Sequence, residues 1–141
     1  MKNKFNCILL IDDDVATNEL HKIIIDGTGV AEKVQSVTSG QEALDYLTNS
    51  RKYEKNNAPF PQPDLIFLDI NMPAMNGFEF IEEYEKLEIN QKGRIVVIML
   101  TSSLNPDDQY AAEKIENING FNNKPLTEQM LFDLTKKYQT E

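Results

Sequence analysis

The chain is poor in cysteine, in basic residues and in long hydrophobic runs, and each shortage excludes a class of protein. Cys7 is the single cysteine among 141 residues, so an intrachain disulfide is impossible and a zinc cluster is not expected. Its position in an apolar run predicts a small core residue. The 14 Lys and Arg residues are outnumbered by 23 Asp and Glu residues, for a formal net charge of -9. This balance argues against a nucleic-acid-binding or anionic-membrane-binding surface, because both need clustered positive charge.

No hydrophobic run in the sequence is long enough to cross a membrane. Residues 2–11 begin with lysines and an apolar segment, as a secretory signal does, but Asn6 interrupts that segment and three aspartates follow it. We therefore expect a cytoplasmic protein. With 40% hydrophobic and 26% charged residues, residues 1–141 are expected to form one globular domain, with no segment left for an output domain.

Continuous apolar runs at 5–11, 64–70 and 94–100 predict three buried β-strands. Apolar residues that do not alternate with polar ones indicate burial on both faces, which is typical of a parallel sheet covered by helices. Two weaker strands are predicted at 33–37 and 120–123. The segment 50–63, with its alternating prolines, is interpreted as a solvated connector, although a partner-docking loop is the alternative.

Segments with helical spacing follow the predicted strands. The first helix is expected to bury one apolar face, made of Ala16, Leu20, Ile23, Ile24 and Gly27. Ser39 with Glu42 predicts a capping box at the second helix, Asn105 with Pro106 predicts the start of the fourth, and Thr127 predicts the cap of the fifth. The repeated strand and helix order predicts an α/β fold, a (βα)5 doubly wound five-stranded parallel sheet in a flavodoxin-like three-layer sandwich.

Four of the predicted strands are followed by side chains with complementary chemistry. In chain order these side chains are Asp12, Asp13, Asp14, Asp69, Thr101 and Lys124. The carboxyl ends of parallel strands meet at one edge of the sheet, so we expect the groups to converge there. Clustered carboxylates repel one another, and a divalent metal relieves that repulsion. An all-oxygen ligand set indicates Mg²⁺.

A carboxylate, a hard metal, a lysine and a hydroxyl are the groups that phosphoryl transfer requires. Asp69 is the candidate nucleophile because it ends the central strand, and its product would be an aspartyl phosphate. Thr101 and Lys124 would hold the oxygens of the transferred group. Each residue alone has an ordinary explanation, and Asp14 is assigned to capping the first helix. The hypothesis depends on four separate strands ending in relevant groups.

The chain resembles a response-regulator receiver domain of two-component signalling, similar to the bacterial chemotaxis regulator. The resemblance covers nearly the whole chain and rests on the segments 10–14, 67–77, 99–103 and 123–126. It implies that Asp69 accepts a phosphoryl group from a histidine kinase or a histidine phosphotransfer protein. Asp13 would hold magnesium directly and Asp12 partly through water, with Asp69 and the Asn71 main-chain carbonyl as further ligands. The Lys124–Pro125 bond would be cis.

The resemblance also assigns regulatory positions. Asn71 and Ser103 would tune the lifetime of the phosphate, and Thr101 and Phe121 would form the switch. The family often has tyrosine where this chain has Phe121, so two interpretations stay open, a switch residue that lacks the hydroxyl or a permanently buried core residue. His21, the single histidine, is interpreted as an ordinary surface residue of the first helix.

These expectations describe a binding module that catalyses only its own phosphorylation and dephosphorylation. Phosphorylation would switch a surface around Tyr110 and Phe121 that an unknown downstream protein reads, or the phosphoryl group would pass onward, and dimerisation on activation stays open. The alternative is a Mg²⁺-dependent aspartyl-phosphate phosphohydrolase, which is disfavoured because Asn71 stands where such enzymes carry a general acid. A docking-only pseudo-receiver is disfavoured because no site residue is missing. A nucleotide-binding flavodoxin relative is disfavoured because the turn after the first strand is acidic.

Overall fold

Strands and helices alternate along the residues that the computed structural model describes, which are 4–48, 61–87, 95–102 and 105–139. The elements are β1 Phe5–Ile11, α1 Val15–Thr28, β2 Ala31–Val37, α2 Gly40–Thr48, β3 Leu65–Asp69, α3 Gly77–Glu85, β4 Val96–Thr101, α4 Pro106–Glu113, β5 Gly120–Asn123 and α5 Glu128–Tyr138. None of the helices in these ranges is long and apolar enough to span a bilayer.

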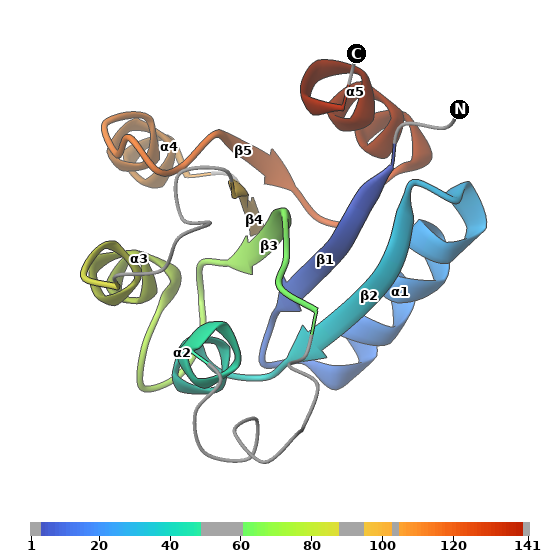
Figure 1. The fold of residues 1–141 in the computed structure, drawn as a ribbon. Helices are drawn as coiled ribbons and strands as arrows, with labels where there is room; N and C mark the ends of the chain where they lie inside the picture. The colour runs from blue at the N-terminus through green and yellow to red at the C-terminus, as the bar shows by residue number, and fades with distance from the viewer. Residues whose placement is uncertain (1–3, 49–60, 88–94, 103–104, 140–141) are drawn as a thin grey trace.

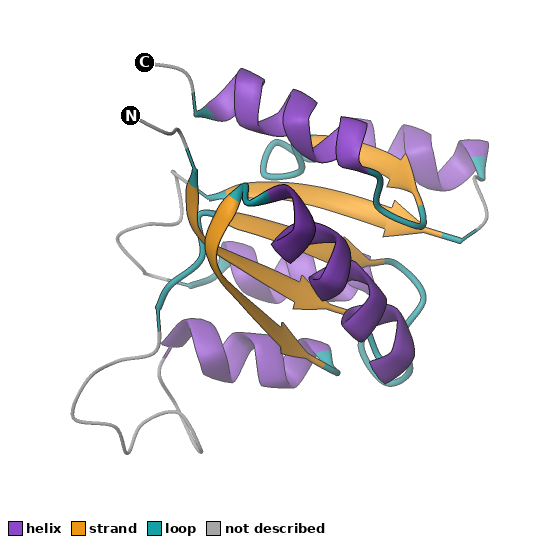
Figure 2. Cartoon of the chain, turned by 90° about the vertical axis from the view of Figure 1, so that its right-hand side faces the viewer, coloured by secondary structure: helices purple, strands orange, loops and turns teal. Residues whose placement is uncertain are grey.

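The five strands form one parallel sheet in the order β2-β1-β3-β4-β5. Helices α1 and α5 cover one face of the sheet, and α2, α3 and α4 cover the other (Figures 1 and 2). The predicted three-layer fold is therefore confirmed. The strand order reverses between β1 and β3, and in such sheets the crevice beyond the carboxyl ends of the strands at that point is the usual ligand site.

Both faces of the three central strands, β1, β3 and β4, are apolar, as their continuous hydrophobic runs predict. The core on the α2, α3 and α4 side includes Leu9, Ile11, Ala43, Ile66, Leu68, Phe80, Val97, Met99 and Ala112. The core on the α1 and α5 side includes Ile8, Leu10, Ile25, Leu65, Phe67, Ile98, Leu131 and Leu134. Cys7 is fully buried, which confirms its prediction as a core residue, and burial raises the pKa of its thiol to about 11.

The predicted helix starts are confirmed, with one difference in a hydrogen bond. Asn105 and Thr127 cap α4 and α5 through their side chains. Ser39 Oγ accepts the main-chain N–H of Glu42 at 3.0 Å, as a capping box requires. The return bond is displaced by one residue, because Glu42 Oε1 accepts from the main-chain nitrogen of Thr38 at 3.0 Å. Either arrangement gives an acceptor to two main-chain N–H groups around the start of the helix.

The predicted buried face of α1 is wrong except at Ile24, which is partly buried against the core. Leu20 and Ile23 are 47% and 67% exposed, and the residues that α1 buries are Asn18, His21 and Ile25. Asn18 Nδ2 donates to the main-chain oxygens of Asp12 at 2.9 Å and Val37 at 3.3 Å. These bonds compensate much of the desolvation cost of the buried amide, so polar residues face the sheet at a position where periodicity favours apolar ones.

Most of the 50–63 connector lies outside the described residues, so its role stays a prediction. Its last residues are attached to α2. Tyr46 Oη donates to the main-chain oxygen of Pro61, and Gln62 Nε2 donates to the Tyr46 main-chain oxygen at 3.3 Å. The chain therefore enters β3 from a fixed point.

The loop between β3 and α3 holds the end of β3 by close backbone contacts. Gly77 lies so near the strand that a Cβ atom there would be 2.8 Å from the main-chain oxygen of Asp69. Ala74 adopts a φ of 66°, which is strained for a residue with a side chain. Asn76 and Glu79 then form a capping box that starts α3. The position of Asp69 thus depends on the absence of a side chain at Gly77.

We predict that Gly77→Ala destabilises the protein by about 1–3 kcal/mol, because the added methyl group overpacks the β3 end. Gly27→Ala is the matched control, since a Cβ at this helical position meets nothing within 4 Å and alanine favours a helix by up to about 1 kcal/mol. Urea denaturation of both variants measures the two free energies of unfolding. Equal stability of Gly77→Ala and the wild type would contradict the close approach.

Candidate functional site

Four neighbouring strands carry the candidate residues to one edge of the sheet. Asp12 follows β1, Asp69 ends β3, Thr101 ends β4 and Lys124 follows β5. In the strand register, Asp69 pairs with Leu100, next to Thr101. Because β1, β3, β4 and β5 are adjacent and parallel, their carboxyl ends point in the same direction. The predicted convergence of these side chains is therefore found in the structure.

The Lys124 ammonium group joins two buried carboxylates. Its Nζ lies 2.6 Å from Asp12 Oδ2 and 3.0 Å from Asp69 Oδ1. Asp12 and Asp69 are only 4% and 5% exposed. The main-chain nitrogen of Lys124 donates to the Thr101 oxygen at 2.8 Å, so β4 fixes the backbone from which the lysine extends. The peptide bond from Lys124 to Pro125 is cis, as expected.

Burial acts in opposite directions on the pKa of Lys124 and on that of Asp69. Burial opposes the charge of Lys124, but its hydrogen bonds to Asp12 and Asp69 outweigh that effect and raise the pKa of the ammonium group. Burial raises the pKa of Asp69; the hydrogen bond from Lys124 opposes this change, and the charges of Asp12 and Asp13 add to it. The lysine therefore stays charged, and an additional cation near Asp69 would stabilise its carboxylate form.

Three acids form a candidate site for a divalent cation. Asp12, Asp13 and Asp69 each offer a carboxylate oxygen, and these oxygens lie within 4.8 Å of one another. Lys124 supplies one positive charge against three carboxylates, so the site keeps an excess of negative charge. Asp13 is exposed, which leaves the cluster accessible from solvent. Oxygen donors of this kind fit a hard divalent cation.

Asp14 has the capping role predicted for it. Its carboxylate accepts from the main-chain nitrogen of Ala16 and from the Thr17 hydroxyl, both at 3.0 Å. The hydrogen bonds from Thr17 are the main cause of a lowered pKa for this exposed acid. The main-chain nitrogen of Asp14 donates to Asp12 Oδ1 at 2.9 Å. The start of α1 thus orients the Asp12 carboxylate that Lys124 contacts.

The interpretation of His21 as a surface residue of the first helix is wrong. His21 is 2% exposed, and its Nε2 accepts from the main-chain nitrogen of Leu126 at 3.3 Å. The spacing from Asn18 through His21 to Ile25 is helical, which is the available sequence signal for this buried face. This signal competes with that of the more apolar face containing Leu20 and Ile23. No property of the sequence alone shows that Asn18 and His21 would find hydrogen-bond partners in the interior.

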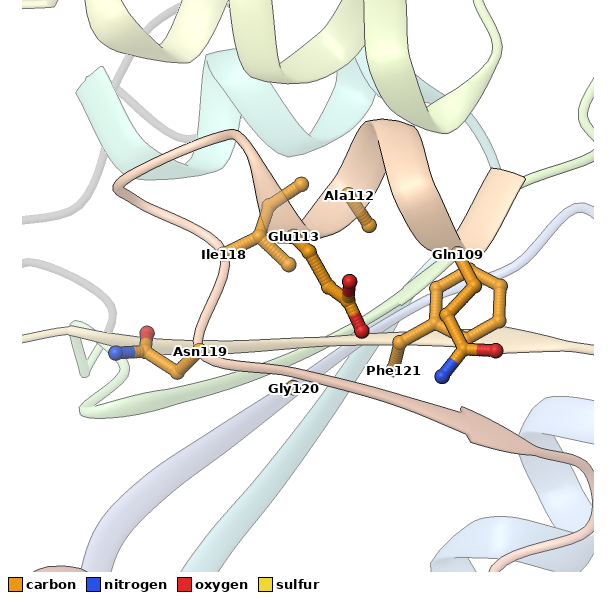
Figure 3. Close-up of a pocket in the computed structure, with 7 residues that line it drawn as sticks. All are labelled: Gln109, Ala112, Glu113, Ile118, Asn119, Gly120 and Phe121. Carbon is orange, nitrogen blue, oxygen red and sulfur yellow. The ribbon is translucent and has the colours of Figure 1, made fainter. Parts of the chain in front are cut away.

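Three of the four regulatory positions predicted from the family resemblance lie in the described residues: Asn71, Thr101 and Phe121. Phe121 is partly buried and lines a cavity of about 350 Å³ between α4 and β5, so it is not a fully buried core residue. The other lining residues are Gln109, Ala112, Glu113, Ile118, Asn119 and Gly120 (Figure 3). Asn71 is exposed. Its metal contact and its effect on phosphate lifetime stay predictions, and Ser103 lies outside the described residues.

Residues 8–136 match the family model of the response regulator receiver domain. The chain belongs to this family. Receiver domains act in two-component signalling, where they interact with histidine kinases and downstream targets. Together with the acidic site, this membership identifies the protein as a receiver domain of a response regulator.

Solved structures support this assignment. A two-component response regulator from Cytophaga hutchinsonii is 37% identical, with a TM-score of 0.84 over 98% of this chain and 99% of that one. Response regulator Rcp1 from Synechocystis sp. is 30% identical over 77% of this receiver domain and 69% of its own length; the structure of its Mn²⁺-bound form superposes with a TM-score of 0.70, covering 94% and 90% of the two chains. The phosphorylated cyanobacterial phytochrome response regulator RcpA is 29% identical, with a TM-score of 0.71 over 94% and 89%.

We predict that His21 makes the receiver domain less stable as the pH falls below about 6.5. Burial is the main cause of the lowered pKa of His21; the charge of Asp12 opposes it and that of Lys124 adds to it. The unfolded chain therefore takes up this proton at a higher pH than the folded protein. The stabilising contribution of neutral His21 is complete above the pKa that this residue has in the unfolded chain. It is lost as the pH falls through the lower pKa that His21 has in the folded protein. The melting temperatures of the wild type and His21→Gln should approach each other as the pH falls from about 7.5 to about 5.5. A difference in melting temperature that stays constant over this range would contradict the assignment.

Proposed function

We propose that this receiver domain is a phosphoacceptor: Asp69 accepts a phosphoryl group from a histidine kinase or a histidine phosphotransfer protein in a Mg²⁺-dependent reaction. The observation that carries the proposal is the position of the Lys124 ammonium, 2.6 Å from Asp12 and 3.0 Å from Asp69. This lysine lies beside one acid that would react and another that would hold a cation. Thr101 supplies a hydroxyl-bearing side chain at the end of the adjacent strand.

The reaction follows from these groups. An Asp69 carboxylate oxygen attacks the phosphorus atom of a phosphohistidine, and the new O–P bond forms as the N–P bond breaks. The electron pair returns to the imidazole nitrogen of the donor, which takes up a proton from solvent. Lys124 and the Thr101 hydroxyl bind oxygens of the transferred group as negative charge spreads over them. Magnesium held by Asp12, Asp13 and Asp69, with the Asn71 carbonyl, would neutralise further charge.

The relatives support the two finer parts of this proposal. Rcp1 has been solved in a Mn²⁺-bound form, and Mn²⁺ and Mg²⁺ both prefer oxygen ligands. RcpA has been solved in a phosphorylated form. These observations belong to those proteins, and the acid cluster and Lys124 are the reasons for extending them to this chain. The protein would then act on no substrate beyond its own acyl phosphate, whose formation and hydrolysis it would catalyse.

The signal would leave through the α4 and β5 surface. In the sheet register Phe121 pairs with Met99, two residues before Thr101, so a movement of Thr101 toward a phosphoryl oxygen would act on the strand beside the Phe121 cavity. Tyr110 is 62% exposed on α4, and Lys114 Nζ lies 4.2 Å from the centre of its ring. Phosphorylation would shift a two-state equilibrium of this surface, which a downstream protein or a second copy of the chain would select.

Asp69→Asn should abolish phosphorylation by phosphoramidate, because the amide lacks the nucleophilic carboxylate. In the wild type with Mg²⁺, one phosphoryl group is gained and ammonia is released. Mass spectrometry under mild conditions measures the added group. Asp14→Asn is the control, since asparagine caps a helix as well as aspartate does and the variant should still be labelled. Labelling of Asp69→Asn would move the nucleophile elsewhere, and steady hydrolysis of phosphate esters by the wild type would favour the phosphohydrolase.

Millimolar Mg²⁺ should raise the melting temperature of the unphosphorylated protein, because a cation that binds only the folded acid cluster stabilises it. Asp13→Asn should remove most of that rise, since it takes away one of the three carboxylates. Differential scanning calorimetry with and without the metal gives both values. A melting temperature that does not change with Mg²⁺ would contradict the cation site.

A further inference from the structure

The His21 side chain connects α1 to the segment that carries Lys124. Its Nε2 accepts the main-chain N–H of Leu126 at 3.3 Å, and both residues are 2% exposed. A buried main-chain N–H without an acceptor is costly. The His21 side chain therefore supplies the hydrogen-bond acceptor that a main-chain carbonyl supplies in an ordinary strand or helix.

The hydrogen bond to His21 also holds the backbone of the short segment that carries Lys124. The Lys124 main-chain nitrogen is held by the Thr101 oxygen at 2.8 Å. Pro125 has no N–H to donate. The Leu126 N–H is therefore the first backbone donor after the lysine, and the bond to His21 fixes the far side of a three-residue segment whose near side β4 already holds.

The bond also defines the chemical form of the imidazole. A main-chain N–H only donates, so Nε2 carries no proton, and the neutral ring keeps its proton on Nδ1. Burial favours the neutral form as well, because it lowers the pKa of His21. The residue is thus a fixed acceptor that α1 directs toward the Leu126 backbone.

We propose that His21 is a positioning residue: by accepting the Leu126 N–H, it keeps Lys124 Nζ between Asp12 and Asp69, ready for the phosphoryl oxygens. This inference rests on the proposed function, since it assigns Lys124 its role in phosphoryl transfer. Loss of the acceptor would loosen the segment and let the ammonium group move away. Small displacements of a group that stabilises a transition state are costly in rate.

Three variants test the proposal. His21→Leu fills the site without an acceptor, His21→Gln restores an acceptor through its amide oxygen, and Leu20→Gln is a control one residue away on the exposed side of α1. With phosphoramidate, the saturating rate of His21→Leu should fall about ten- to a hundredfold. Its half-saturating Mg²⁺ concentration should not rise, because the metal ligands are untouched and an ammonium group that moves away leaves them more negative. His21→Gln should recover most of the rate, and Leu20→Gln should match the wild type.

Hydrogen exchange measured by nuclear magnetic resonance tests the geometry without any phosphorylation. Exchange of the Leu126 amide and of the Lys124 ammonium group should accelerate in His21→Leu and return toward wild-type rates in His21→Gln. Unchanged Lys124 exchange in folded His21→Leu would overturn the proposal, and so would an equal loss of rate in the leucine and glutamine variants. If the wild type accepts no phosphoryl group, the proposed function fails and these exchange rates alone decide the role of His21.

Discussion

An ammonium group shared by two buried carboxylates is the interaction on which the rest of the structure depends. Charges this deeply buried persist only when they are paired and hydrogen-bonded. Lys124 satisfies Asp12 and Asp69 together, yet Asp13 adds a third carboxylate to the same cluster. The site is therefore compensated in part, and the remaining negative charge is what makes it receptive to cations.

The surrounding fold is arranged to hold this unbalanced cluster in place. Three independent backbone contacts fix its members: Asp14 N–H orients Asp12, Gly77 lies against the Asp69 oxygen, and Thr101 accepts the Lys124 N–H. Each contact comes from the segment that follows a strand or from the end of a neighbouring strand. Parallel strands bring such segments together at one edge, which explains why this topology suits a site built from residues far apart in sequence.

Much of this arrangement could be predicted from the sequence. The strands at Phe5–Ile11 and Gly120–Asn123 have the predicted bounds. A mostly apolar run followed by three aspartates defines the first strand locally, and the turn residues Gly120 and Pro125 define the limits of the second. The convergence of Asp12, Asp69 and Lys124 also followed, since it needs only the strand order and the residues at the strand ends. These features depend on short-range pattern and on topology.

The errors share one physical cause. Periodicity ranks helix faces by hydrophobicity, and it favoured Leu20 and Ile23 over Asn18 and His21. The structure buries the polar pair because main-chain groups of Asp12, Val37 and Leu126 form hydrogen bonds with them. Two of these three partners lie 19 and 105 residues away, so no local pattern contains them. The cavity beside Phe121 is similarly the product of packing between α4 and β5.

The buried thiol of Cys7 has a practical consequence for measuring this protein in motion. It is inaccessible to solvent and its pKa is raised to about 11, so almost none of it is thiolate at neutral pH and alkylating reagents find no nucleophile there. A cysteine introduced at Tyr110, which is exposed on α4, would then be the sole reactive thiol. A fluorophore attached at that position would report on the α4 surface from an otherwise native background.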